Sequence, residues 1–129
     1  MIALSIDGGT RKEREMAYDA FSFAMKYLMP RKKNLSVDIV ITDIEDDAEA
    51  YHCCIEKGQH EIEIQEGLIE EDFISAVFHE MVHVKQGVRK EWAFIEVAYK
   101  THDEYINLPW EVEAYELQEV MLEAWKKEL

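Results

Sequence analysis

The residues best suited to carry chemistry are two histidines and a glutamate in the segment FHEMVHV. His79 and His83 are four residues apart, and Glu80 directly follows the first of them. On a helix, residues at this spacing lie on one face, one turn apart, so their imidazole nitrogens can converge on one metal ion. The glutamate can hold a water molecule against that ion as a general base. The spacing therefore predicts a Zn²⁺ site with His79 and His83 as ligands and Glu80 as the catalytic base.

The helix that carries this motif is predicted over residues 69–86. Apolar side chains cover most of its surface, which is typical of a buried helix. At about 100° per residue, its polar residues fall in one narrow stripe, which comprises Asp72, Ser75, His79, His83 and Gln86. Buried polar groups need partners, and one metal ion would satisfy both histidines. The alternative is a pair of hydrogen-bonded histidines in the core.

A third protein ligand is expected, because catalytic zinc usually has three protein ligands and a water molecule. A last helix is predicted near residues 109–126, with Pro109 in its first turn. Its apolar arc comprises Trp110, Ala114, Leu117, Val120, Met121, Ala124 and Trp125. Glu113 lies inside this arc, whereas Glu111 and Glu116 lie outside it. A carboxylate on a buried face needs a partner, so Glu113 is the predicted third ligand and Glu116 the second choice. The alternative is that Glu113 reaches water at the edge of the helix.

Residues that follow the motif exclude one type of zinc site and supply candidate hydrogen-bond donors. A zincin with a third histidine would have Gly and His where this chain has Gln86 and Arg89, so that pattern is excluded. Hydrolysis also needs a hydrogen-bond donor opposite the metal, and Tyr99, His102 and Tyr105 are candidates because they lie between the two helices. His52, His60 and His102 have no ligand spacing, and each is interpreted as a surface or hairpin residue.

The elements that must position these residues follow from local patterns. A strand is predicted over residues 1–7, and a capping box at Thr10 and Glu13 begins a helix that Pro30 ends near Leu28. Alternation predicts a strand over 35–41 and a hairpin, YHCCIEK and HEIEIQE, around Gly58-Gln59. Residues 89–108 remain ambiguous between strand and helix. The order predicts one α+β domain spanning residues 1–129, with Cys53 and Cys54 as ordinary strand residues.

Composition limits the partners of the chain. It has 129 residues, of which 48% are hydrophobic, and a formal net charge of −14. Such a surface repels phosphate backbones, so nucleic acid is not an expected partner. The apolar runs are too short to span a membrane, and no secretory signal is recognised, so we expect a cytoplasmic protein without membrane contact. We expect a monomer.

Two segments carry a resemblance to a known group of proteins. HEMVHVKQ, followed about thirty residues later by PWEVEAYE, resembles small HExxH zincins whose third ligand is glutamate. These include minimal gluzincins, the ImmA/IrrE-like and SprT-like groups, and short metallopeptidase-like proteins of bacteriophages. The resemblance covers roughly residues 70–120. It departs from the ImmA/IrrE pattern at Tyr115, where asparagine is expected, and a stand-alone minimal protein fits it best.

The resemblance implies a zincin-like fold, with a small sheet of three or four strands beside the N-terminal, motif-bearing and C-terminal helices. It also implies that Glu113, the glutamate directly before alanine, binds the metal. Substrate would bind extended along an edge strand next to the metal. Because the strand 60–66 directly precedes the motif-bearing helix, its residues His60, Ile62 and Ile64 are the predicted substrate edge.

The expected activity is zinc-dependent hydrolysis of peptide bonds in an extended peptide or protein substrate. One alternative is a non-catalytic or latent zinc-binding module that acts through a protein partner. Another is a structural zinc site or a metal-free helical core. These alternatives differ in whether the fourth position at the metal is open to solvent.

Overall fold

The protein is described here from a computed structural model that covers residues 1–44, 48–90 and 106–128. Its elements, in chain order, are β1 (Ile2–Gly8), α1 (Arg11–Leu28), β2 (Leu35–Thr42), β3 (Ala50–Glu56), β4 (Gln59–Gln65), α2 (Glu70–Arg89) and α4 (Pro109–Glu128). The predicted α+β class is confirmed. Each predicted helix and strand has a counterpart, and the predicted capping box of Thr10 and Glu13 begins α1.

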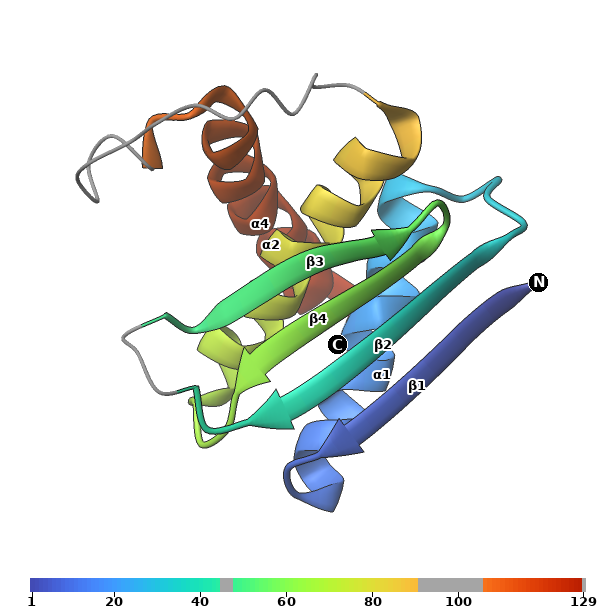
Figure 1. The fold of residues 1–129 in the computed structure, drawn as a ribbon. Helices are drawn as coiled ribbons and strands as arrows, with labels where there is room; N and C mark the ends of the chain where they lie inside the picture. Colours follow the sequence, from blue (N-terminus) through green and yellow to red (C-terminus); the bar gives the residue numbers. More distant parts are fainter. Residues whose placement is uncertain (45–47, 91–105, 129) are drawn as a thin grey trace.

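The four strands form one mixed sheet in the order β1-β2-β4-β3 (Figure 1). β1 pairs parallel with β2, and β2 pairs parallel with β4. β3 pairs antiparallel with β4 through the hairpin. Side chains along β2 and β4 alternate between buried and half-buried positions, as expected for a sheet with one covered face.

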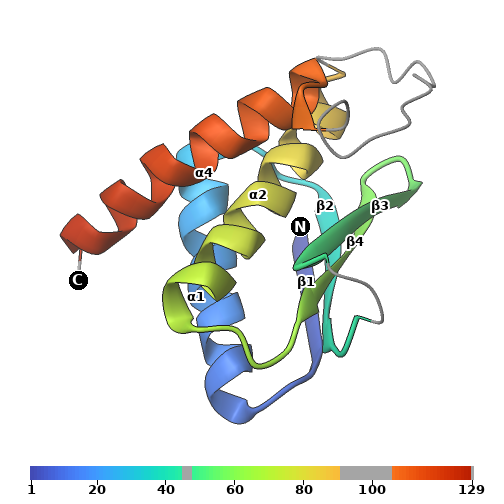
Figure 2. The ribbon, with the colours of Figure 1, turned by 90° about the vertical axis from the view of Figure 1, so that its left-hand side faces the viewer.

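All three helices lie on the same side of the sheet: α1 and α2 pack on its face, and α4 packs on α2 (Figure 2). The core is apolar and includes Val37, Ile39 and Ile41 from β2, Ile62 and Ile64 from β4, Phe73, Phe78, Met81 and Val82 from α2, and Ala114 and Met121 from α4. α2 therefore lies in the middle of the molecule, in contact with the sheet, α1 and α4. Among the described helices, none has an apolar stretch that could cross a bilayer.

Strand order overturns one prediction from the sequence. β4, which carries His60, Ile62 and Ile64, lies between β2 and β3 and is not an edge strand. The side chains of Ile62 and Ile64 are fully buried, so they cannot line a substrate groove. The prediction was wrong because it assumed that the strand preceding α2 in sequence must be the one at the edge. The hairpin instead folds β3 back outside β4, and β3 is the edge strand on that side.

The hairpin itself differs from the prediction by one residue. Its turn is formed by Lys57 and Gly58 rather than by Gly58 and Gln59, and Gln59 already belongs to β4. Gly58 has φ of 78°, in the left-handed region that glycine adopts without a steric cost. The pairing of β3 with β4 is irregular between Cys54 and Glu56, close to this turn.

Candidate metal centre

α2 brings the motif into the centre of the protein because it is apolar on almost every side. Three carboxylates occupy its first turn, where the positive end of the helix dipole favours them. Phe78 precedes the motif and Met81 and Val82 lie between its glutamate and its second histidine; the side chains of all three have no exposed area. His79 and His83 face α4, where both contact Glu111, and His83 also faces His52 of β3; Glu80 lies beside them.

The three motif residues form a buried cluster that could hold a metal ion. One potential ligand atom from each of His79, Glu80 and His83 lies within 4.8 Å of the others. His79 and His83 are each 9% exposed and Glu80 is 5% exposed. The convergence that the sequence predicted for these residues is therefore present in the fold.

A carboxylate from α4 completes the cluster. Oε1 of Glu111 lies 3.0 Å from Nε2 of His79 and 2.6 Å from Nε2 of His83. The Glu111 side chain is 1% exposed, which makes it one of the most buried polar groups in the described part of the chain. Glu111 belongs to the first turn of α4, where that helix approaches α2. The cluster therefore has two ring nitrogens and one carboxylate oxygen at its centre.

The sequence prediction for the third ligand needs correction at this point. The structure does not bring Glu113 to the histidines; its Oε1 accepts hydrogen bonds from Gln86 Nε2 at 2.9 Å and from Lys85 Nζ at 3.4 Å. Glu116, the second choice, is exposed. The apolar arc gave the wrong face because Val120, one of its members, is 53% exposed. The face that packs on α2 is centred instead on Glu111, Ala114 and Met121.

The second nitrogen of each histidine ring is held by a glutamine. Nδ1 of His83 lies 2.8 Å from Gln86 Oε1, and Nδ1 of His79 lies 2.6 Å from Gln118 Oε1. The amide of Gln86 can have only this orientation, because its Nε2 donates to the carbonyl of Trp110 and to Glu113. An amide oxygen only accepts, so Nδ1 of each ring carries the hydrogen. Nε2 of each ring then presents its lone pair toward Glu111.

This arrangement is suited to a cation. Two lone pairs and a carboxylate oxygen face one another in a buried space, where such groups repel unless a positive charge lies between them. Protonation of a ring supplies that charge, and so does a metal ion. Burial lowers the pKa of His83, but the hydrogen bond to Glu111, the charges of Glu80 and Glu111 and the bond to Gln86 outweigh it and raise the pKa. Nitrogen, nitrogen and oxygen ligands in a buried site fit a divalent metal.

Glu80 has the environment of a proton-transfer group. Burial raises the pKa of its carboxyl, the charges that His83 and His79 can carry lower it, and Glu111 raises it again, with a net upward direction. A carboxyl with a raised pKa takes and returns a proton at a pH closer to neutral than an exposed carboxyl does. Glu111, in contrast, contacts both Nε2 atoms, so the two carboxylates beside these histidines have different environments.

A second pair of histidines lies beside the cluster, and their contact was not predicted from the sequence. Nε2 of His52 on β3 is 2.8 Å from Nδ1 of His60 on β4, and the two rings stack. The His52 ring also stacks on His83, with ring centroids 6.1 Å apart. His60 lies in the hairpin, as one of its two interpretations had it, but it is 1% exposed and is therefore not a surface residue. Burial, followed by the charges of His60 and His83, lowers the pKa of His52 to about 3.

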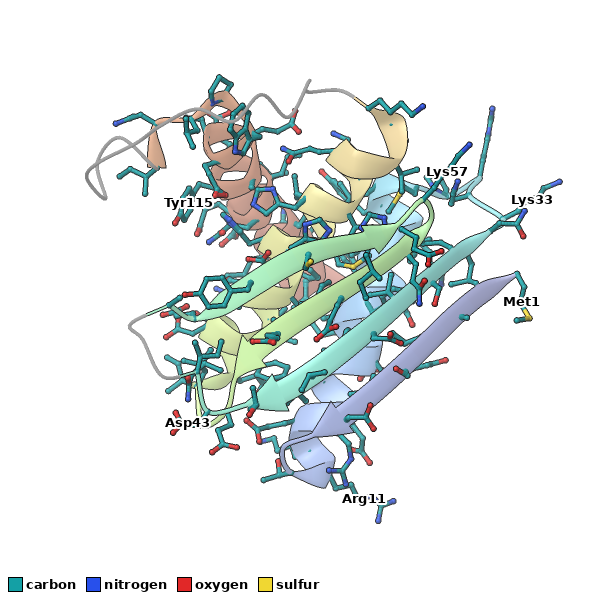
Figure 3. The ribbon with its side chains drawn as sticks, in the orientation of Figure 1. Met1, Arg11, Lys33, Asp43, Lys57 and Tyr115 are labelled. Atoms are coloured by element: carbon teal, nitrogen blue, oxygen red, sulfur yellow. The ribbon has the colours of Figure 1, made fainter. Side chains whose placement is uncertain are left out.

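Tyr115 covers the other side of the cluster. Its ring meets the His79 ring edge to face, with centroids 4.6 Å apart and an interplanar angle of 60°. Figure 3 shows Tyr115 on α4, above β3 in that view. Burial, with the charges of Glu111, Glu80 and Glu49, raises the pKa of its phenol. The three predicted donors, Tyr99, His102 and Tyr105, lie outside the described residues.

No family model matches the chain, and neither a curated protein nor a solved structure matches it significantly. The chemistry of the site therefore rests on its residues and their geometry.

Proposed function

We propose that this protein is a zinc-dependent hydrolase of peptide bonds, with His79, His83 and Glu111 as the metal ligands. The observation that carries the proposal is the convergence of both Nε2 atoms on one buried Glu111 oxygen, with Glu80 beside them. Two histidines and a carboxylate are the ligand set of one class of catalytic zinc site, in which a fourth position is left for water. Zinc is preferred because this mixture of imidazole and carboxylate suits it.

The roles of the protein groups follow from their environments. A bound zinc ion would polarise the scissile carbonyl and acidify the attacking water. Glu80 takes the proton of that water as its oxygen adds to the carbonyl carbon, and then returns a proton to the leaving amine. Burial supports this role, because the raised pKa of Glu80 brings proton uptake and release closer to neutral pH. Gln86 and Gln118 keep both rings in the tautomer that leaves Nε2 free to bind metal.

A zincin-like arrangement is part of the same proposal. β3 is the antiparallel edge strand beside α2, and the stacking of His52 on His83 brings it next to the cluster. An extended peptide could add to such an edge by main-chain hydrogen bonds, which would hold a peptide bond near the metal. β3 thus replaces β4 as the proposed substrate strand. The substrate class would be an extended peptide or an unfolded segment of a protein.

Zinc binding tests the ligand assignment directly. Untagged protein should bind about one zinc ion per chain, and Glu111→Gln should weaken binding by a factor of 100 or more because a ligand is lost (an order-of-magnitude expectation). Glu116→Gln is the matched control, since Glu116 lies on the same helix and is exposed. Equal losses in both variants, or zinc binding unaffected by Glu111→Gln, would overturn the assignment.

Hydrolysis is tested separately with Glu80→Gln. This variant should bind zinc as the wild type does and cleave no member of a fluorogenic peptide library that the wild type cleaves. A fully active Glu80→Gln protein would remove Glu80 from the mechanism. Zinc uptake by the wild type without cleavage of any peptide would replace the proposed activity with a non-catalytic zinc-binding module.

A further inference from the structure

α4 presents a stripe of three polar residues to the cluster. Glu111, Tyr115 and Gln118 are spaced by four and three residues, so they lie on one face of the helix. Glu111 faces both Nε2 atoms, and Gln118 bonds Nδ1 of His79. Tyr115 lies between them in the stripe and contacts the His79 ring. Glu111 and Gln118 thus bond to the histidine rings, whereas Tyr115 contacts His79 through its ring alone.

The hydroxyl of Tyr115 distinguishes it from its neighbours. It forms no hydrogen bond with any residue that the structure describes, although its ring is fixed against His79. The side chain is 41% exposed, so the residue borders both the cluster and solvent. A buried ring edge combined with an accessible hydroxyl is suited to contact a bound molecule rather than to fill the core.

The other polar groups around His79 cannot donate a hydrogen bond to an incoming oxygen. Glu80 and Glu111 are acceptors when ionised. Gln118 turns its oxygen to His79 and its nitrogen toward Glu119. Attack of water on an amide puts negative charge on the carbonyl oxygen, and an acidic site without a donor would oppose that charge. Among the described residues on this side, Tyr115 supplies the available O–H group.

We propose that Tyr115 is a catalytic residue that donates a hydrogen bond from its hydroxyl to the substrate carbonyl oxygen as that oxygen becomes negative. This inference rests on the proposed peptide hydrolysis. The water oxygen forms a bond to the carbonyl carbon, the electron pair of the C=O double bond moves to its oxygen, and Glu80 receives the proton of the water. The O–H bond of Tyr115 stays intact throughout. When the intermediate collapses, the C=O bond reforms and the amine leaves with the proton from Glu80.

Tyr115→Phe separates this role from packing, because phenylalanine keeps the ring against His79 and removes only the hydroxyl. Tyr18→Phe is the matched control, since Tyr18 is an exposed tyrosine on α1. The probe is a series of phosphinic pseudotripeptides, whose tetrahedral phosphorus carries anionic oxygens in place of the carbonyl. Zinc affinity is measured on the same samples.

In zinc-loaded protein, Tyr115→Phe should weaken probe binding by about 10- to 100-fold, as expected for one hydrogen bond to a charged group. Zinc affinity should change less than about twofold, since the ligands and their glutamines are untouched. Unchanged probe affinity would overturn the role of Tyr115 and leave the proposed function intact. A parallel loss of zinc affinity would reassign Tyr115 to the support of His79. Zinc-loaded wild type that binds no member of the series would overturn the proposed function, and this role with it.

Discussion

The amide oxygen of Gln86 accepts a hydrogen bond from Nδ1 of His83 at 2.8 Å, while its amide nitrogen binds Glu113 at 2.9 Å. Glu113 therefore acts on the centre through Gln86. Gln86 is fully buried, so it has no water to replace either partner. The chain from Glu113 through Gln86 to His83 fixes which nitrogen of that ring is available, and Gln118 does the same for His79.

Replacement of these glutamines should weaken metal binding without removing a ligand. We expect Gln86→Leu and Gln118→Leu each to lower zinc affinity by about 10- to 100-fold, because the ring loses its fixed tautomer and orientation. Competition with a chelating dye measures the affinity. Gln59→Leu, on β4 and away from the Nε2 atoms, serves as the control. Wild-type affinity in both cluster variants would show that the glutamines do not support the ligands.

Metal binding should also stabilise the fold. At a free zinc concentration about 100 times the dissociation constant, binding to the folded state alone adds about 2.7 kcal/mol to the free energy of unfolding. For a domain of this size that corresponds to a rise in Tm of roughly 10 °C. Thermal unfolding with zinc and with a chelator measures the shift. Glu111→Gln should lose most of this shift, and Glu116→Gln, at an exposed position of α4, should keep it; an equal shift in both variants would contradict the site.

The histidine pair should make the metal-free protein sensitive to acid. The pKa of His52 is lowered to about 3 in the folded protein, from an ordinary value of 6.5. Between those values the unfolded chain binds the proton and the folded protein does not, so stability falls as the pH decreases from about 6.5 toward 3. One such group contributes at most about 1.4 kcal/mol per pH unit. Urea unfolding of wild type and His52→Gln between pH 7 and pH 4 should give a shallower decline for the variant. Identical declines would contradict this origin of the acid sensitivity.

Glu13 should give a second, separate pH dependence at the other end of the molecule. Its carboxylate accepts hydrogen bonds from the backbone N–H of Thr10 and of Gly67, each at 2.9 Å, and these bonds lower its pKa. A lowered pKa means that this stabilisation is present above the unfolded value of 4.5 and is lost as the pH falls through the folded value. The carboxylate joins the start of α1 to the turn that precedes α2.

Glu13→Gln should therefore destabilise the protein by about 1–2 kcal/mol at pH 7, because one N–H loses its acceptor. The difference from wild type should shrink as the pH falls from 4.5 toward the lowered pKa of the folded state, because the stabilisation by the ionised carboxylate is lost over that range. Glu15→Gln is the control, since Glu15 is exposed and pairs with Arg11 at the surface. A difference that stays constant from pH 7 to pH 3 would exclude ionisation of Glu13 as the cause.

Local patterns were sufficient to predict the elements and the motif. The capping box, the alternation along β2 and β4 and the periodicity of α2 depend on residues close in sequence, and each appears as predicted. The convergence of His79, Glu80 and His83 follows from helix geometry alone. These are the features that need no knowledge of how the elements pack.

The errors fall where packing between distant elements decides the outcome. Glu111 rather than Glu113 reaches the histidines because the first turn of α4 lies against α2. The apolar residues of a helix do not show which of its turns will contact another helix. His52 and His60 meet because the hairpin register places His52 opposite Ile62, two residues from His60 on the same face of β4, and the alternation pattern does not determine that register.

The Glu111 contacts join α2 to the first turn of α4, at a residue 28 positions after His83. The centre therefore exists only while α4 is docked, and each excursion in which α4 separates from α2 dismantles it. An ion held by both helices would make that excursion rarer, because separation would require its release. Amide hydrogen exchange along α4 would thus be slower when the centre holds an ion. A protease that cleaves α4 once it has separated from α2 would cleave mainly the metal-free protein.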